Sequence, residues 1–175
     1  MRTTALLGAA ALSVSALAMA APASASTTSG SVICPIGAQS TTYSPGLKYA
    51  PPAPTSVSST GTLGGCVSTD GNHTAASYTF NGSGSLNCLT GSSSGSGTID
   101  WSDPGTSPSR FTYTAAITVR PNGIVVSTLT GPVSSGDYAG NVISATFILP
   151  STDLLGCTTS QGLTNTSGVF TASLL

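Results

Sequence analysis

The sequence predicts an all-β protein, either an antiparallel β-sandwich or a closed β-barrel of about eight strands, held by two disulfides. Three observations support this prediction. Apolar and polar residues alternate with a period of two over several segments, as in strands with one buried face. Clusters of Gly, Pro, Asn and Asp separate these segments. Four cysteines form an even set in a chain that begins with an export signal.

Residues 1–25 predict a secretory signal peptide. Arg2 precedes an apolar run from Ala5 to about Ala20, and Ala23-Ser24-Ala25 is a small-residue cleavage signal. The run is too short and too rich in alanine for a membrane span, and no second apolar stretch of that length follows, so we expect no membrane span in the mature chain. Residues 26–175 are then a single secreted β domain, because a chain of about 150 residues can bury one core.

The predicted mature chain carries few charges. Its basic residues are Lys48, Arg110 and Arg120, and its acidic residues are five aspartates with no glutamate. A nucleic-acid-binding surface needs a cluster of Lys and Arg, so nucleic acid is excluded as a partner. The low charge does not predict disorder, because apolar residues keep the strand alternation over long spans.

The four cysteines of an exported chain predict two disulfides, for which three pairings exist. Folding the chain back about a turn centred near Ala50 brings Cys34 opposite Cys66, which favours Cys34–Cys66 and leaves Cys88–Cys157. A zinc site is the alternative, but no Cys-x-x-Cys spacing exists and the chain has a single histidine. We therefore expect neither a metal nor another cofactor.

Turn-forming residues divide the first half of the mature chain into four predicted strands. Ser-Pro-Gly within 43–47 predicts a turn, and three prolines within 49–54 predict an extended connection that cannot be a central strand. Gly82 and Gly84 predict a bulge or bend in the third strand. The four strands are predicted over 31–43, 55–66, 74–88 and 94–101.

Residues 110–149 carry the strongest signal, that of three consecutive strands. Every second residue from 111 to 119 is apolar, and Pro121-Asn122-Gly123 predicts a type I turn with a G1 bulge. If Arg120 opposes Ile124, both flanking strands keep mostly apolar sets on one face. The predicted facing pairs are Val119 with Val125, Ile117 with Ser127 and Ala115 with Leu129. The third strand ends before Pro150, and a long loop over 150–165 precedes a last strand over 169–175.

Trp101 is the centre of one candidate site. It is the only tryptophan, and Asp100 and Asp103 flank it in the sequence. A pair of carboxylates beside an aromatic ring is the arrangement that a glycosidase would need. On a strand, however, Asp100 points away from Trp101, and Asp103-Pro104-Gly105 is ordinary turn chemistry. We therefore predict no catalytic residue and retain Trp101, Tyr138 and Asp100 as a candidate ligand platform.

A second group of polar residues surrounds the single histidine. His73 lies near Asp70, and a Ser-His-Asp triad can be drawn with one of the many serines, but no Gly-x-Ser-x-Gly elbow accompanies it. We therefore expect His73 to lie in a solvated loop. Asp70, Asn72, Asp137 and Asn141 offer oxygen atoms to calcium, yet none belongs to a loop with a full ligand set, so no metal site is predicted.

Four segments of the chain, which are the export signal and several turns and glycine-spaced strands, resemble segments of exported proteins. They are the alanine-rich export signal, Thr42-Tyr43-Ser44-Pro45-Gly46-Leu47, Gly82-Ser83-Gly84-Ser85-Leu86-Asn87-Cys88 and Ser135-Gly136-Asp137-Tyr138-Ala139-Gly140. Together they resemble the sequences of small, uncharacterised exported β-rich proteins of actinobacteria. The resemblance covers most of the mature chain, and it implies an exported β domain without implying an activity.

Two functional hypotheses follow. The first is a secreted, non-catalytic protein that acts by surface contact with a protein or glycan at the cell surface, because a neutral surface rich in Ser, Thr, Asn and Tyr suits such contacts. The alternative is a carbohydrate-binding module or small glycan hydrolase that uses Trp101 and nearby Tyr and Asp side chains. That alternative requires an exposed indole, whereas a Trp101 that shares the buried face of Ile99 has a packing role.

Overall fold

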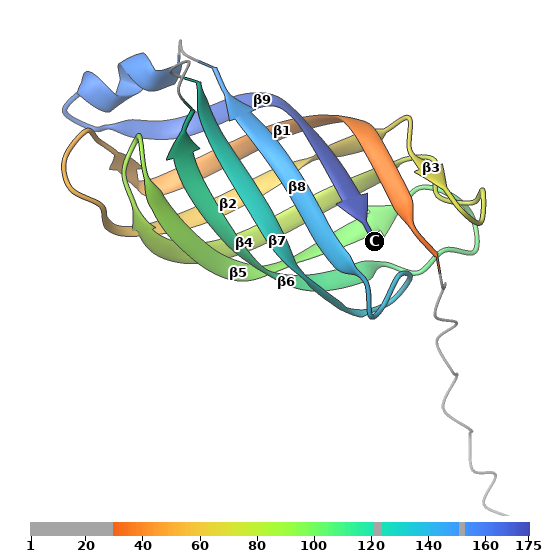
Figure 1. Cartoon of the computed structure of the whole chain (residues 1–175). Coiled ribbons are helices and arrows are strands. Elements are labelled where there is room, and N and C mark those ends of the chain that lie inside the picture. Colours follow the sequence, from red (N-terminus) through yellow and green to blue (C-terminus); the bar gives the residue numbers. More distant parts are fainter. Residues whose placement is uncertain (1–29, 121–123, 151–152) are drawn as a thin grey trace, which may run out of the picture.

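The chain folds into a closed antiparallel β-barrel (Figure 1). The computed structural model describes residues 30–120, 124–150 and 153–175; the predicted signal peptide over 1–25 and the turn Pro121-Asn122-Gly123 lie outside the described residues. Eight of the described strands follow one another around the barrel, and the pairing of the last with the first closes it. The elements are β1 (Val32–Leu47), β2 (Ala53–Gly64), β3 (Val67–Ser68), β4 (Ala76–Leu86), β5 (Gly91–Trp101), β6 (Ser109–Val119), β7 (Val125–Ser135), β8 (Val142–Leu149), the 3-10 helix η1 (Asp153–Thr158) and β9 (Leu163–Leu174).

The barrel has two distinct ends. One is the η1 end, where η1 lies at the same end as the connections β1–β2 and β4–β5 (Figure 1). The other is the β3 end, where the two-residue strand β3 pairs with the first residues of β1. The all-β prediction is confirmed, and of its two alternatives the closed barrel is the one that forms.

The predicted hairpin register of β6 and β7 is confirmed. Val119 faces Val125, Ile117 faces Ser127 and Ala115 faces Leu129. The Arg120 N–H donates to the Ile124 carbonyl at 2.8 Å, as the predicted turn requires. A shift by one residue would move the apolar side chains of a strand to solvent, so alternation along both strands is enough to define this pairing.

Three predicted boundaries are wrong. The predicted turn over 43–47 is strand, because β1 continues to Leu47 and pairs there with Leu163 after an irregularity in the register. The last strand begins at Leu163 rather than at 169, because its polar first half pairs with β1. The predicted loop over 150–165 also contains η1.

Both predicted disulfides are present. Cys34–Cys66 joins the start of β1 to the short connection between β2 and β3, with a Cα–Cα distance of 4.0 Å. Cys88–Cys157 joins the β4–β5 turn to η1 across 69 residues of sequence. The second bridge therefore anchors η1, which otherwise contacts mainly β9, to the opposite side of the η1 end.

Aromatic side chains fill the middle of the barrel because glycines lie directly beside them on the neighbouring strands. The centroid of the Phe80 ring lies 5.1 Å from that of Tyr113 and 6.3 Å from that of Phe147. A side chain at Gly97 would place its Cβ 2.5 Å from Phe111, and one at Gly61 would place it 2.7 Å from the Tyr78 ring. Large residues opposite small ones fill the interior of small barrels. The glycine-rich strands β4 and β5 are thus a requirement of the core.

Candidate functional site

Polar and aromatic side chains meet at the β3 end of the barrel. They come from the connection between β3 and β4, from the end of β5 and from the connection between β7 and β8. We call this group the β3-end cluster. Its members are Asp70, His73, Trp101, Asp137 and Tyr138.

His73 is the centre of the β3-end cluster. Its Nε2 lies 2.9 Å from Asp137 Oδ2, and its Nδ1 lies 3.0 Å from Asp70 Oδ2. Only 2% of its surface is exposed. The prediction of a solvated His73 is therefore wrong, because each ring nitrogen has a carboxyl group as its hydrogen-bond partner, which makes burial of the ring favourable.

The rings of Trp101 and Tyr138 pack against the His73 ring and against each other. The indole lies edge-on to the His73 ring with centroids 4.7 Å apart, and the Tyr138 ring lies at the same distance from His73. The Trp101 N–H donates to Ser109 Oγ at 2.9 Å, and the Ser109 hydroxyl donates to the Asp137 carbonyl. Trp101 is 9% exposed and Tyr138 is fully buried, so the packing role of Trp101 is the one that the structure shows.

The three residues of the candidate ligand platform do not form one exposed surface. Trp101 and Tyr138 face the interior, whereas Asp100 is exposed on the outer face of β5, as the strand alternation predicts. Asp103, the second carboxylate beside Trp101, accepts hydrogen bonds from the Thr74 N–H at 2.7 Å and from the Thr74 hydroxyl at 2.9 Å. Asp103 thus joins the β3–β4 and β5–β6 connections, in keeping with its predicted turn role.

The electrostatics of the β3-end cluster favour a charged Asp70 and a neutral Tyr138. Partial burial raises the pKa of Asp70, but hydrogen bonds from the Ser68 hydroxyl, the Asn72 N–H and His73 outweigh this effect and lower it to about 2. Burial, and next the negative charge of Asp70, raise the pKa of Tyr138 to about 12. The Tyr138 hydroxyl is therefore a donor near neutral pH.

The cluster holds loops together and has no free catalytic base. A histidine that activates a nucleophile needs one ring nitrogen to accept the proton of that nucleophile. Both nitrogens of His73 face carboxylates instead. In the described part of the chain, no three His, Cys, Asp or Glu side chains are placed to hold a metal ion. What the β3-end cluster does chemically is to fix three connections across one end of the barrel.

The lowered pKa of Asp70 predicts an acid-dependent loss of stability. A carboxylate with a folded pKa of about 2 and an ordinary value of 3.8 stabilises the folded state above pH 4 and loses that contribution as the pH falls toward 2. We expect Asp70→Asn to unfold at a lower urea concentration than wild type at pH 6. The two midpoints should converge at pH 2, and a constant difference from pH 6 to pH 2 would contradict the prediction.

One side of the outer barrel surface consists almost entirely of hydroxyl groups. We call the outward residues of β2, β4, β5 and β6 the hydroxyl wall. The strand registers align them in rows across the four strands, one of which contains Ser58, Asn81, Ser96 and Thr112. Its hydroxyl and amide residues are Ser56, Ser58, Thr60, Thr62, Ser77, Thr79, Asn81, Ser83, Ser85, Ser92, Ser94, Ser96, Thr98, Thr112, Thr114 and Thr118; Asp100, Arg110 and Ala116 also face outward on these strands.

The other side of the outer surface carries exposed aliphatic side chains. We call this group on β1, β3, β8 and β9 the apolar wall. Its residues are Ile33, Ile36, Val67, Val142, Ile148 and Val169, each about half exposed or more, with Ser and Thr of the same strands between some of them. Ile36, Ile148 and Val169 line one shallow hollow. No charged residue lies on these four strands.

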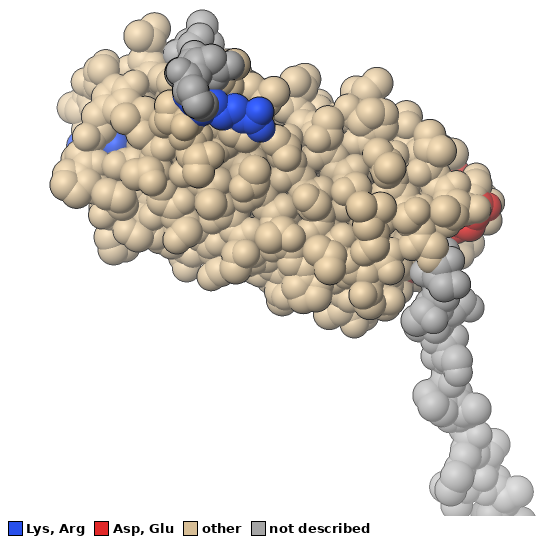
Figure 2. All heavy atoms as spheres, viewed as in Figure 1, with Lys and Arg blue, Asp and Glu red and all other residues tan. Residues whose placement is uncertain are grey.

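Charged side chains gather toward the two ends of the molecule. Figure 2 shows Asp at the β3 end and Lys and Arg toward the η1 end, with an uncharged surface between them on the visible face. The sequence analysis did not find the two walls, because it followed the inward residues of each strand. The signal was present in the outward residues, which are Ser and Thr in 77–98 but include Val142, Ile148 and Val169 farther along the chain.

No protein-family model, no curated protein and no solved structure matches the chain. Among the described residues, no helix has the length and apolar character needed to cross a membrane.

Proposed function

We propose that the chain is an exported, non-catalytic protein that acts by contact between its apolar wall and an apolar surface of another protein at the cell surface. The predicted signal peptide and the two disulfides support export, because disulfides persist in oxidising compartments. The resemblance to exported proteins of actinobacteria agrees with this. The observation that carries the proposal is the apolar wall itself.

The apolar wall differs from the rest of the surface in a way that favours a protein partner. Val67 is 73% exposed, and Ile36 and Val169 are about two-thirds exposed, although most outward residues of β4 and β5 are Ser and Thr. Contiguous exposed apolar side chains with polar surroundings are typical of interaction sites. The absence of charge on the four strands of the wall removes the desolvation cost of charged groups on binding.

A glycan partner is the second candidate, and the structure supports it less. Glycan-binding surfaces use aromatic rings on which sugars stack, whereas Tyr49 is the only aromatic residue among the exposed large hydrophobic residues of the described chain. Trp101 and Tyr138 are buried. The hydroxyl wall could still contact a polysaccharide by hydrogen bonds, so a glycan-array screen distinguishes the two candidates: we expect no specific glycan to bind.

Lysine substitutions test the proposed contact. Burying an unpaired charge in an apolar interface is costly, so Ile148→Lys with Val169→Lys should lower the retention of the protein on the surface of producing cells at least about tenfold. Thr79→Lys with Thr112→Lys adds the same charge to the hydroxyl wall and is the matched control. We expect that control to be retained as wild type is. Equal retention of both variants, or no retention of wild type, would contradict the proposal.

A further inference from the structure

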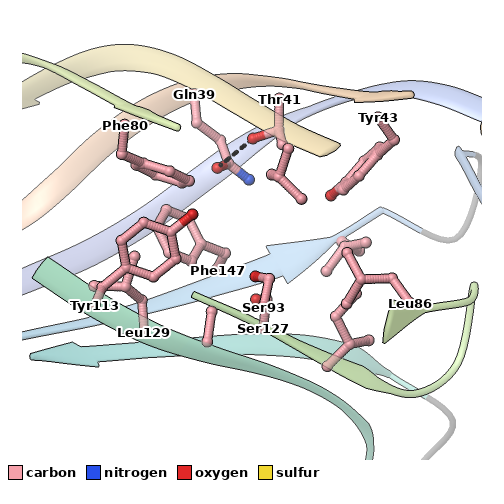
Figure 3. A pocket seen from close by; sticks show the side chains of 14 residues that line it. Gln39, Thr41, Tyr43, Phe80, Leu86, Ser93, Tyr113, Ser127, Leu129 and Phe147 are labelled. Atoms are coloured by element: carbon pink, nitrogen blue, oxygen red, sulfur yellow. Dashed lines mark hydrogen bonds between the residues drawn. The ribbon is translucent and has the colours of Figure 1, made fainter. Parts of the chain in front are cut away.

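The half of the barrel interior nearer the η1 end contains a cavity of about 40 Å³ (Figure 3). It exists because small residues face inward there: Ser93 on β5, Ala115 on β6 and Ser127 on β7 line it. Toward the middle of the barrel, the corresponding space is filled by the rings of Phe80 and Phe147, which close the cavity on that side. The cavity is separate from the β3-end cluster and from both outer walls.

One buried hydroxyl points into this cavity without a partner. Tyr113 is 3% exposed, and its Oη has no hydrogen-bond partner among the described residues. Figure 3 shows this hydroxyl directed into the space below Gln39 and Thr41. Those two residues share a hydrogen bond, which the Thr41 hydroxyl donates to Gln39 Oε1 at 3.2 Å. A buried polar group without a partner is unfavourable, so such a group in a cavity indicates a ligand or water.

All the polar groups that line the cavity are uncharged. Tyr43 also lines it, and its hydroxyl lies 3.4 Å from Thr166 Oγ1. Burial raises the pKa of Tyr113; the neighbouring Ser93 hydroxyl offsets part of this rise without a hydrogen bond of acceptable geometry. Tyr113 therefore stays protonated near neutral pH and can donate. None of the residues that line the cavity is charged.

We propose that this cavity binds a small uncharged molecule that offers one oxygen atom to the Tyr113 hydroxyl, such as a simple ketone, amide or alcohol. The apolar remainder of the lining, which includes Leu86, Ile117 and Leu129, suits the carbon part of such a molecule. A charged molecule is excluded because no opposite charge compensates for its desolvation. A cavity needs roughly 10–15 Å³ of this kind of volume to hold one water molecule, so the 40 Å³ cavity has room for about three or four non-hydrogen atoms.

Acetone, acetamide and acetate test the proposal, because they are nearly equal in size and only acetate is charged. Two-dimensional NMR of the folded protein follows the amide signals of Ser93 and Ala115 during titration with each probe. We expect saturable shifts with millimolar affinity for acetone and acetamide, because so few atoms can contribute little binding energy. Acetate should bind at least about tenfold more weakly.

Three variants identify the cavity as the site of binding. Tyr113→Phe should weaken acetamide binding on the order of fivefold, because it removes one hydrogen bond. Ala115→Leu should abolish binding by filling the space. Tyr78→Phe is the matched control: its hydroxyl is also buried without a partner, but Tyr78 is not among the residues that line the cavity. This control should bind as wild type does.

Several results would overturn the proposal. One is the absence of a saturable shift with any probe, which would show that water alone occupies the cavity. Another is equal affinity for acetate and acetamide. The third is an equal effect of Tyr113→Phe and Tyr78→Phe, which would assign the change to folding rather than to binding. If Ala115→Leu fails to fold, the comparison of the two tyrosine variants still decides. Loss of surface retention in the lysine variants leaves this result unaffected.

Discussion

Replacing Trp101 with alanine is expected to lower the free energy of unfolding by about 3–5 kcal/mol. The indole packs against His73 and Tyr138 and donates a hydrogen bond to Ser109, so its removal leaves a cavity at the end of the barrel. Urea unfolding of the variant and of wild type measures the difference.

Trp101→Phe is the matched control for this prediction. It keeps most of the ring volume and loses the indole N–H, so we expect a cost of roughly 1–2 kcal/mol. Fluorescence gives a second measurement, because Trp101 is the only tryptophan. The native emission should be blue-shifted and insensitive to iodide. A red-shifted emission that iodide quenches, with little loss of stability in Trp101→Ala, would show that the indole is exposed.

His73→Leu is expected to lower the free energy of unfolding by about 3–5 kcal/mol, because it leaves the buried Asp137 carboxyl group without its partner on the histidine ring. Asp137 Oδ2 would keep only the Ser107 N–H, which now donates to it at 2.8 Å. The comparison uses urea unfolding near neutral pH, where the carboxylate is charged in the unfolded chain.

A double variant separates the Asp137–His73 interaction from simple packing. His73→Leu combined with Asp137→Asn leaves no buried carboxyl group without its histidine partner, so it should be more stable than the sum of the two single changes predicts. If the costs of the single changes simply add, the Asp137–His73 pair does not act as a unit. That outcome would contradict the account in which the paired side chains of the β3-end cluster together fix the connections at this end of the barrel.

The sequence was sufficient to predict strands and one register, but not the closure of the barrel. The pairing of Val119 with Val125 is local and follows from the turn and the alternation. The pairing of β1 with β9, such as Ala38 with Val169, joins the two ends of the chain. A sandwich and a barrel have the same alternation of inward and outward residues, so a period of two cannot distinguish them.

The candidate site was predicted less well, for a related reason. His73 lies in a polar loop, and what buries it is Asp137, 64 residues farther along the chain. Trp101 was assigned two alternative roles because the shared face with Ile99 predicts burial while the next turn does not. Its position beside His73 and Tyr138 depends on three connections meeting at one end of the barrel, which no single segment specifies.

The most direct test of contact through the apolar wall is site-specific photo-crosslinking in producing cells. One variant carries a photoreactive residue at Val169 on the apolar wall, and the other carries it at Thr79 on the hydroxyl wall; both side chains are exposed. We expect a discrete crosslinked protein product from position 169 and none from position 79. Products from position 79 alone, or equal products from both positions, would contradict the proposed function.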